Sequence, residues 1–128
     1  MDIVINSTRP EELIDITDQI RKAAKDSQVK NGIMVLYVPH TTAAITVNEN
    51  TDMNLRQDML NSLERLIPKQ GNYGHKGGNA YAHIKSSLIG QNLSLIIENG
   101  DLKLGKWQNI YFCEFDGPRK RNLYVTIK

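Results

Sequence analysis

Three histidines are the side chains in this sequence most suited to acid–base chemistry or metal binding. His75 and His83 flank a Gly-Gly-Asn step in the segment HKGGNAYAH, and His40 opens the segment HTTAAITVNEN. Histidine is the commonest metal ligand, and its charge changes near neutral pH. No HExxH or CxxC motif is present, and two glycines keep His75 and His83 off a shared helical face. Each histidine alone is better explained as a surface or core residue, so only their joint placement favours a site.

The loop before His83 has the composition of an anion-binding site. Gly77 and Gly78 lead to Asn79, which is placed to cap a helix. A glycine-rich loop that enters a helix presents free backbone N–H groups to a phosphate, and Lys76 is nearby in sequence. An ordinary mobile loop with an asparagine cap explains the same residues equally well.

Several other polar residues have both a functional and a structural explanation. A carboxylate at Glu49, after an apolar strand, could act as a base or hold a metal, but a capping turn is the preferred interpretation. Glu114 and Asp116 share one side of a strand, which either faces solvent or lines a site. The basic run 119–121 is expected at an exposed strand end, although such a cluster can hold a phosphate. Cys113 is expected to be a small core residue.

Length and composition describe an ordinary globular protein. The 128 residues fit one domain, 1–128, with 40% hydrophobic and 23% charged residues. A net charge of +2 is far below what duplex nucleic acid binding needs, and no apolar run is long enough to span a membrane. A single cysteine excludes an internal disulfide, and the first residues have no secretory pattern, so we expect a cytoplasmic protein.

Hydrophobic periodicity predicts strands before, between and after the helices. The first half is expected to contain a helix over 18–28 with Thr17 as its cap, a strand over 33–38 buried on both faces, and a helix from Asp52 to Ile67. Further strands are expected at 2–6 and 42–47, whereas the segment 11–17 is ambiguous.

The second half begins with an irregular loop over 68–79, followed by a short helix from Asn79 to Leu88. The Asn99-Gly100 pair predicts a hairpin, and two strands joined at residues 116–118 complete the chain. Because the strands do not alternate regularly with helices, the prediction is an antiparallel or mixed α+β domain.

Four segments together resemble the YjbQ family, often described as secondary thiamine-phosphate synthases. They are HTTAAITVNEN at 40–50, GNAYAHIKSSLIG at 78–90, ENGDLKLGKWQ at 98–108 and CEFDGPRKR at 113–121. The likeness covers essentially the whole chain, in the family's order and spacing. It implies a β-sandwich flanked by two or three helices, a homotrimer, and a cleft that contains the histidines. The weak activity associated with the family joins hydroxymethylpyrimidine diphosphate to thiazole phosphate.

The resemblance also implies roles for individual residues. The implied catalytic residues are His40, Glu49, His75 and His83, and the three histidines are the implied ligands of a divalent metal, Mg²⁺ or Zn²⁺. The implied substrate-binding residues are Thr41, Thr42, Asn79, Gln108 and Arg119. A pyrimidine ring could stack on an aromatic side chain, for which the candidates are Tyr73, Tyr81 and Trp107.

Three departures from the family pattern bear on activity. Gly77 and Tyr81 stand where the family pattern has two carboxylates, and Lys106 replaces a threonine before Trp107. Losing two acids removes candidate metal ligands or bases and makes the pocket more positive. Three functions therefore stay open: a transferase acting on phosphorylated heterocycles, a three-histidine metal-dependent hydrolase, and a non-enzymatic binder of a small phosphorylated metabolite.

Overall fold

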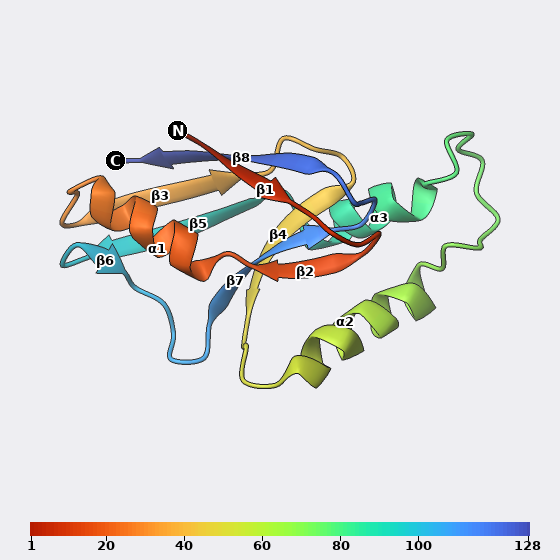
Figure 1. Cartoon of the computed structure of the whole chain (residues 1–128), viewed down its shortest axis with the longest axis horizontal. Coiled ribbons are helices and arrows are strands. Elements are labelled where there is room, and N and C mark those ends of the chain that lie inside the picture. Colours follow the sequence, from red (N-terminus) through yellow and green to blue (C-terminus); the bar gives the residue numbers. More distant parts are fainter.

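A computed structural model describes all 128 residues and shows two β-sheets with three helices (Figure 1). In chain order the elements are β1 (Asp2–Asn6), β2 (Glu12–Asp15), α1 (Thr17–Asp26), β3 (Gly32–Tyr37), β4 (Ala43–Asn48), α2 (Met53–Leu66), α3 (Ala80–Ile89), β5 (Asn92–Glu98), β6 (Asp101–Leu102), β7 (Asn109–Glu114) and β8 (Lys120–Ile127). The five-stranded sheet has the order β1-β8-β3-β5-β6, and the three-stranded sheet has the order β2-β7-β4. Every strand pair is antiparallel, so the α+β sandwich predicted from the sequence is confirmed.

The three-stranded sheet is buried on both faces. In β7, Ile110 and Phe112 pack into the main core between the two sheets, where α1 also contributes. Tyr111 and Cys113 alternate with them and pack against the opposite layer, formed by α2 and α3. Burial raises the pKa of the Cys113 thiol to about 12, so this cysteine is an inert core residue, as predicted.

The five-stranded sheet buries only one of its faces. In β3, Met34 and Leu36 are fully buried, but Ile33, Val35 and Tyr37 are 59%, 38% and 49% exposed. The prediction that this strand is buried on both faces is therefore wrong, because no helix covers its outer side (Figure 1). A continuous apolar run could not distinguish a doubly buried strand from one with an uncovered apolar face.

The start of α1 differs from the prediction, whereas the start of α2 agrees with it. Thr17 is the first residue of α1 instead of its cap: its hydroxyl donates to Asp15 Oδ1 at 2.6 Å and accepts from the Ile110 amide at 2.8 Å. Asp52 does cap α2, since its Oδ1 accepts from the Asn54 amide at 2.8 Å. No helix in the chain combines the length and apolar character needed to cross a bilayer.

A fully buried lysine fixes α3 against its surroundings. Lys85 Nζ lies 2.8 Å from Glu11 Oε2 and 3.0 Å from Glu64 Oε1 of α2, and it lies over the ring of Tyr81. Buried charges persist in proteins when they are paired in this way. The pairing holds α3 in position, and α3 carries His83 and Ser87.

Candidate functional site

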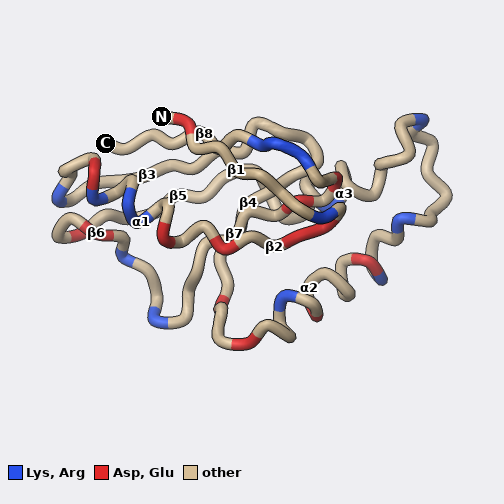
Figure 2. Tube along the Cα trace, in the orientation of Figure 1, with Lys and Arg blue, Asp and Glu red and all other residues tan.

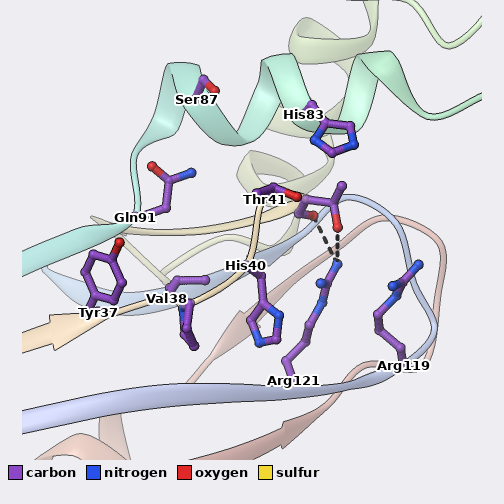
Figure 3. Close-up of a pocket in the computed structure, with 11 residues that line it drawn as sticks. Tyr37, Val38, His40, Thr41, His83, Ser87, Gln91, Arg119 and Arg121 are labelled. Carbon is purple, nitrogen blue, oxygen red and sulfur yellow. Dashed lines mark hydrogen bonds between the residues drawn. The ribbon is translucent and has the colours of Figure 1, made fainter. Parts of the chain in front are cut away.

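A pocket of about 840 Å³ opens at the end of the sandwich where the β3–β4 connection, α3 and the start of β8 meet (Figure 3). Eleven residues line it: Tyr37, Val38, Pro39, His40, Thr41, Thr42, His83, Ser87, Gln91, Arg119 and Arg121. None of these residues is acidic. Two arginines and two histidines therefore supply the charged and titratable groups of the pocket wall.

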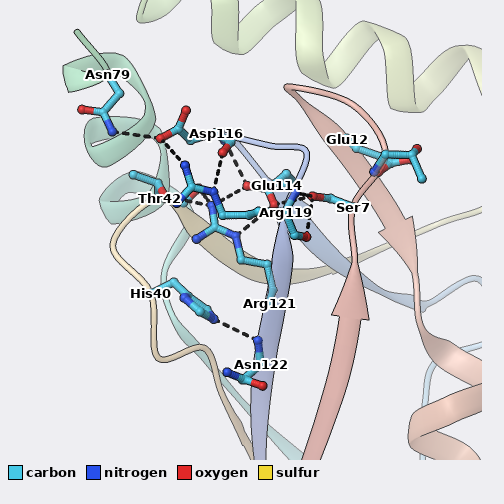
Figure 4. A network of polar contacts seen from close by, with 11 residues as sticks. Ser7, Glu12, His40, Thr42, Asn79, Glu114, Asp116, Arg119, Arg121 and Asn122 are labelled. Carbon is cyan, nitrogen blue, oxygen red and sulfur yellow. Dashed lines mark hydrogen bonds and ion pairs between the residues drawn. The ribbon is translucent and has the colours of Figure 1, made fainter. Parts of the chain in front are cut away.

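Arg121 is buried, although it belongs to the basic run expected at an exposed strand end. Its side chain is only 2% exposed, because it shares the inward face of β8 with Leu123 and Val125. Its Nε donates to Glu114 Oε1 at 2.9 Å, and its Nη2 donates to the other Glu114 oxygen and to Thr42 Oγ1 at 2.8 Å (Figure 4). Nη1 has no partner in the protein and is free to serve a ligand in the pocket that Arg121 lines.

Glu114 lies behind the pocket wall and is completely buried. Besides Arg121, it accepts from Ser7 Oγ at 2.7 Å and from the Asp116 amide at 3.0 Å. Burial alone raises the pKa of Glu114, but the hydrogen bonds from Arg121, Ser7 and the Asp116 amide outweigh it and hold the pKa below its usual value. Glu114 is therefore ionised at neutral pH and fixes the Arg121 guanidinium.

Arg119 is held in the same manner by a different carboxylate. Its Nε donates to the Asp116 carbonyl at 2.8 Å and its Nη2 to Asp116 Oδ2 at 3.0 Å, which leaves Nη1 free. Asp116 Oδ2 also accepts from Asn79 Nδ2 at 2.9 Å, so the Asn79 side chain supports this carboxylate and does not cap α3 (Figure 4). Both arginines thus present a free edge while a carboxylate holds the opposite edge.

His40 has a defined protonation pattern. Its Nε2 accepts from the Asn122 amide at 2.9 Å, so the proton of the neutral ring lies on Nδ1. Burial and the nearby Arg121 charge lower the pKa of His40, which keeps the ring neutral at physiological pH. His40 is therefore suited to donate a hydrogen bond from Nδ1.

The lowered pKa of His40 predicts a loss of stability in acid. The unfolded chain takes up a proton near the usual pKa of 6.5, before the folded chain does, so the stability due to neutral His40 is complete above that pH and is lost as the pH falls below it. Urea unfolding of wild type and His40→Gln between about pH 8 and pH 5 measures this contribution. The variant is expected to lose less stability across that range than wild type. Exposed His75→Gln is the matched control, and equal pH profiles for wild type and His40→Gln would contradict the prediction.

The other two histidines lie together, but the structure does not bring His40 into one group with them. His83 lines the pocket, and the exposed His75 packs edge-on against it with ring centroids 5.1 Å apart. No group of three histidine, cysteine or acidic side chains in the chain is arranged to hold a metal ion. In addition, His40 Nε2 is already occupied by the Asn122 amide.

Two residues implied by the resemblance lie away from the pocket. Glu49 follows β4, whereas His40 precedes it, and a six-residue strand at about 3.3 Å per residue separates its ends by about 20 Å. Gln108 precedes β7 at that same far end, where its Oε1 accepts from the Gly105 amide at 2.8 Å. Thr41 and Thr42 do line the pocket, as do His40, His83 and Arg119.

The aromatic candidates also differ from the sequence-based choice. Tyr73 and the exposed Trp107 do not line the pocket, and Tyr81 is enclosed by the Lys69 and Lys85 ammonium groups. Among the Phe, Tyr and Trp residues of the chain, Tyr37 alone lines the pocket. Sequence reasoning did not identify Tyr37, Ser87 or Gln91 as site residues, and it offered Glu114 and Arg121 only as the functional alternative to an exposed strand end.

The residues that line the pocket include basic but no acidic side chains, and the carboxylates of Asp116 and Glu114 pair with the two arginines from behind. Figure 2 shows the basic residues at the start of β8. The fold and this pocket together define a small α+β sandwich protein with a polar, arginine-containing pocket at one end.

Comparison with known proteins gives the family. The sequence model described as UPF0047 protein YjbQ-like matches residues 1–128, and the chain belongs to the YjbQ/UPF0047 family. The UPF0047 protein of Methanocaldococcus jannaschii is 54% identical over 96% of this chain and 89% of its own length. The UPF0047 protein YugU of Bacillus subtilis is 44% identical over 96% of this chain and 94% of its own length.

A solved structure supports the fold directly. An uncharacterised YjbQ/UPF0047 protein of Clostridium acetobutylicum superposes with a TM-score of 0.97 at 48% identity, over 100% of this chain and 99% of that one. A protein of unknown function from Sulfolobus solfataricus superposes with a TM-score of 0.95 at 36% identity, over 99% and 94% of the two chains. The family and its architecture follow from these matches, and the family's function is not established by them.

Proposed function

We propose that the pocket binds the phosphate or diphosphate group of a small metabolite. The observation that carries this proposal is the pair of free Nη1 edges, on Arg119 and Arg121, in a pocket without an acidic lining residue. Guanidinium groups form strong charge-assisted hydrogen bonds to phosphate oxygens. The Nδ1–H group of His40, together with Thr41, adds donors for a tetrahedral anion.

We further propose that the chain uses this pocket as a transferase of the thiamine-phosphate-synthase type. The thiazole nitrogen would form a new bond to the exocyclic methylene carbon of hydroxymethylpyrimidine diphosphate. The bond from that carbon to oxygen breaks, and diphosphate leaves with the electron pair, so no proton need be removed. Donors placed where charge develops on the leaving group accelerate such a step. Arg119, Arg121 and His40 are the groups suited to that role.

A non-enzymatic binder is the second candidate function. It is favoured by the position of Glu49 at the far end of β4, which leaves the pocket without a carboxylate to act as a base or to hold Mg²⁺. The hydrolase alternative needs three imidazoles around one metal, and His40 does not share a metal-binding group with His75 and His83. Metal analysis of the purified protein tests that alternative.

Product formation distinguishes the transferase from the binder. Wild-type protein given both thiamine precursors and Mg²⁺ is expected to form thiamine phosphate, and Arg119→Gln is expected to lower the rate by about a hundredfold because it removes a donor to the leaving group. Arg65→Gln removes an equal charge from α2, which contributes no residue to the pocket wall, and should leave the rate unchanged. Binding of diphosphate without any product from folded wild type would contradict the transferase and favour the binder.

We also propose that the exposed face of the five-stranded sheet joins subunits of a homotrimer. Four exposed apolar side chains on this face lie outside the pocket: Val4, Ile33, Val35 and Ile96. Sedimentation of wild type is expected to give a trimer, and Val35→Lys is expected to weaken association because it places a charge in the apolar contact. Asp18→Lys on the exposed side of α1 is the control. A monomeric wild type would contradict this proposal.

A further inference from the structure

The pocket has a second end that carries no formal charge. Figure 3 shows Arg119 and Arg121 toward one end, and Tyr37, Ser87 and Gln91 toward the other. The phosphate proposal uses only the first end. The uncharged end is therefore available to the part of the ligand that carries the phosphate.

The side chains at the uncharged end present one ring face and a defined hydrogen-bond acceptor. Gln91 Nε2 donates to the Ser86 carbonyl at 3.2 Å, which leaves Gln91 Oε1 as the group without a protein partner. The Ser87 hydroxyl is exposed and makes no hydrogen bond within the protein. Tyr37 is 49% exposed, and its ring is the single Phe, Tyr or Trp ring of the pocket.

Strand register sets the distance between the two ends. Tyr37 of β3 pairs with Tyr124 of β8, and Arg121 lies three residues before Tyr124. At about 3.3 Å per residue, the Cα atoms of Tyr37 and Arg121 lie about 10 Å apart along the strand direction. A phosphate carried by one ring system spans a distance of this order, whereas an inorganic anion reaches only one end.

We propose that Tyr37, Ser87 and Gln91 form a second subsite, which binds a planar ring bearing an N–H or amino donor. The ring packs against Tyr37, and the donor is accepted by Gln91 Oε1. This inference rests on the proposed phosphate site and narrows its ligand to a phosphate ester of such a ring. Aromatic contact and a neutral hydrogen bond each add a modest increment of affinity.

Calorimetry with three probes tests the subsite. The probes are inorganic phosphate, phenyl phosphate, which adds a ring, and para-aminophenyl phosphate, which adds an amino donor to that ring. Wild type is expected to bind the aminophenyl ester tightest and inorganic phosphate weakest. Tyr37→Leu should weaken both esters by about three- to tenfold and leave inorganic phosphate within about twofold. Gln91→Leu should remove the advantage of the amino ester over the phenyl ester, which is expected to be about three- to tenfold.

Matched controls separate the subsite from general effects on the fold. Tyr124→Leu removes the tyrosine paired with Tyr37 on the same sheet face but outside the pocket, and Gln19→Leu removes an exposed glutamine of α1. Neither change should alter any of the three affinities. Equal affinity of wild type for all three probes, or an equal loss for all three in Tyr37→Leu, would overturn the subsite alone. Failure of wild type to bind any probe would overturn the phosphate site and the subsite with it.

Discussion

Replacing Glu114 with glutamine is expected to destabilise the folded chain by about 3–5 kcal/mol, the cost of leaving a buried charge unpaired. Glu114 is completely buried and Arg121 is 2% exposed, so water cannot replace the missing carboxylate charge. Glutamine keeps the size of the side chain and can still accept from Ser7. The loss is therefore due to charge and not to a cavity. Urea unfolding at neutral pH measures it directly.

Two further variants test whether the loss of stability comes from an unpaired buried charge. Glu98→Gln breaks the exposed ion pair with Lys103, and such pairs contribute about 0–1 kcal/mol. The double variant Glu114→Gln with Arg121→Met removes both buried charges, so it should recover most of the stability lost in the single variant. A single variant that loses less than about 1 kcal/mol would show that the pair is not desolvated as the structure indicates.

The second large effect is expected on diphosphate affinity. Arg119→Gln removes one guanidinium edge from the pocket, and hydrogen bonds between charged groups are worth enough to weaken binding by about 10- to 100-fold. Arg119 is half exposed and stabilises the fold little, so its variant should unfold as wild type does. The double variant Glu114→Gln with Arg121→Met lacks the Arg121 guanidinium, so its affinity for diphosphate should fall by a similar factor.

Charge-matched controls are needed because any lost cation weakens anion binding slightly. Arg65→Gln on α2 has the same net charge as Arg119→Gln and should bind diphosphate as wild type does at moderate salt, where charges beyond about 10 Å are screened. Equal losses in Arg65→Gln and Arg119→Gln would mean that net charge alone governs affinity. That result would remove the support for a built phosphate site.

Much of the fold could be predicted from the sequence because turn residues and hydrophobic spacing determine individual helices and hairpins locally. The Asn99-Gly100 hairpin has both residues at positive φ, as its sequence requires, and the spacing around Leu63 gives α2. The outer face of β3 could not be predicted. Whether a sheet face is covered depends on where the helices pack, and an apolar sequence does not contain that information.

The site was only partly predictable. His40 and His83 stand out by type, and the structure brings both to one pocket. Arg121 shares its parity with Leu123 and Val125, and Glu114 shares its parity with Phe112, so alternation did contain a signal that both side chains face inward. That the two meet depends on the packing of one sheet on the other, which no local pattern gives.

An NMR titration of isotope-labelled wild type with diphosphate tests the central claim most directly, because it reports where the anion binds. The largest shifts are expected on the Arg119 and Arg121 Nε–H signals and on the amides of Thr41 and Asn122. A second basic hollow, lined by Lys25 and Lys30 among others, serves as an internal comparison. Shifts concentrated at those lysines, or no shifts at saturating diphosphate, would contradict a phosphate site at the end of the sandwich.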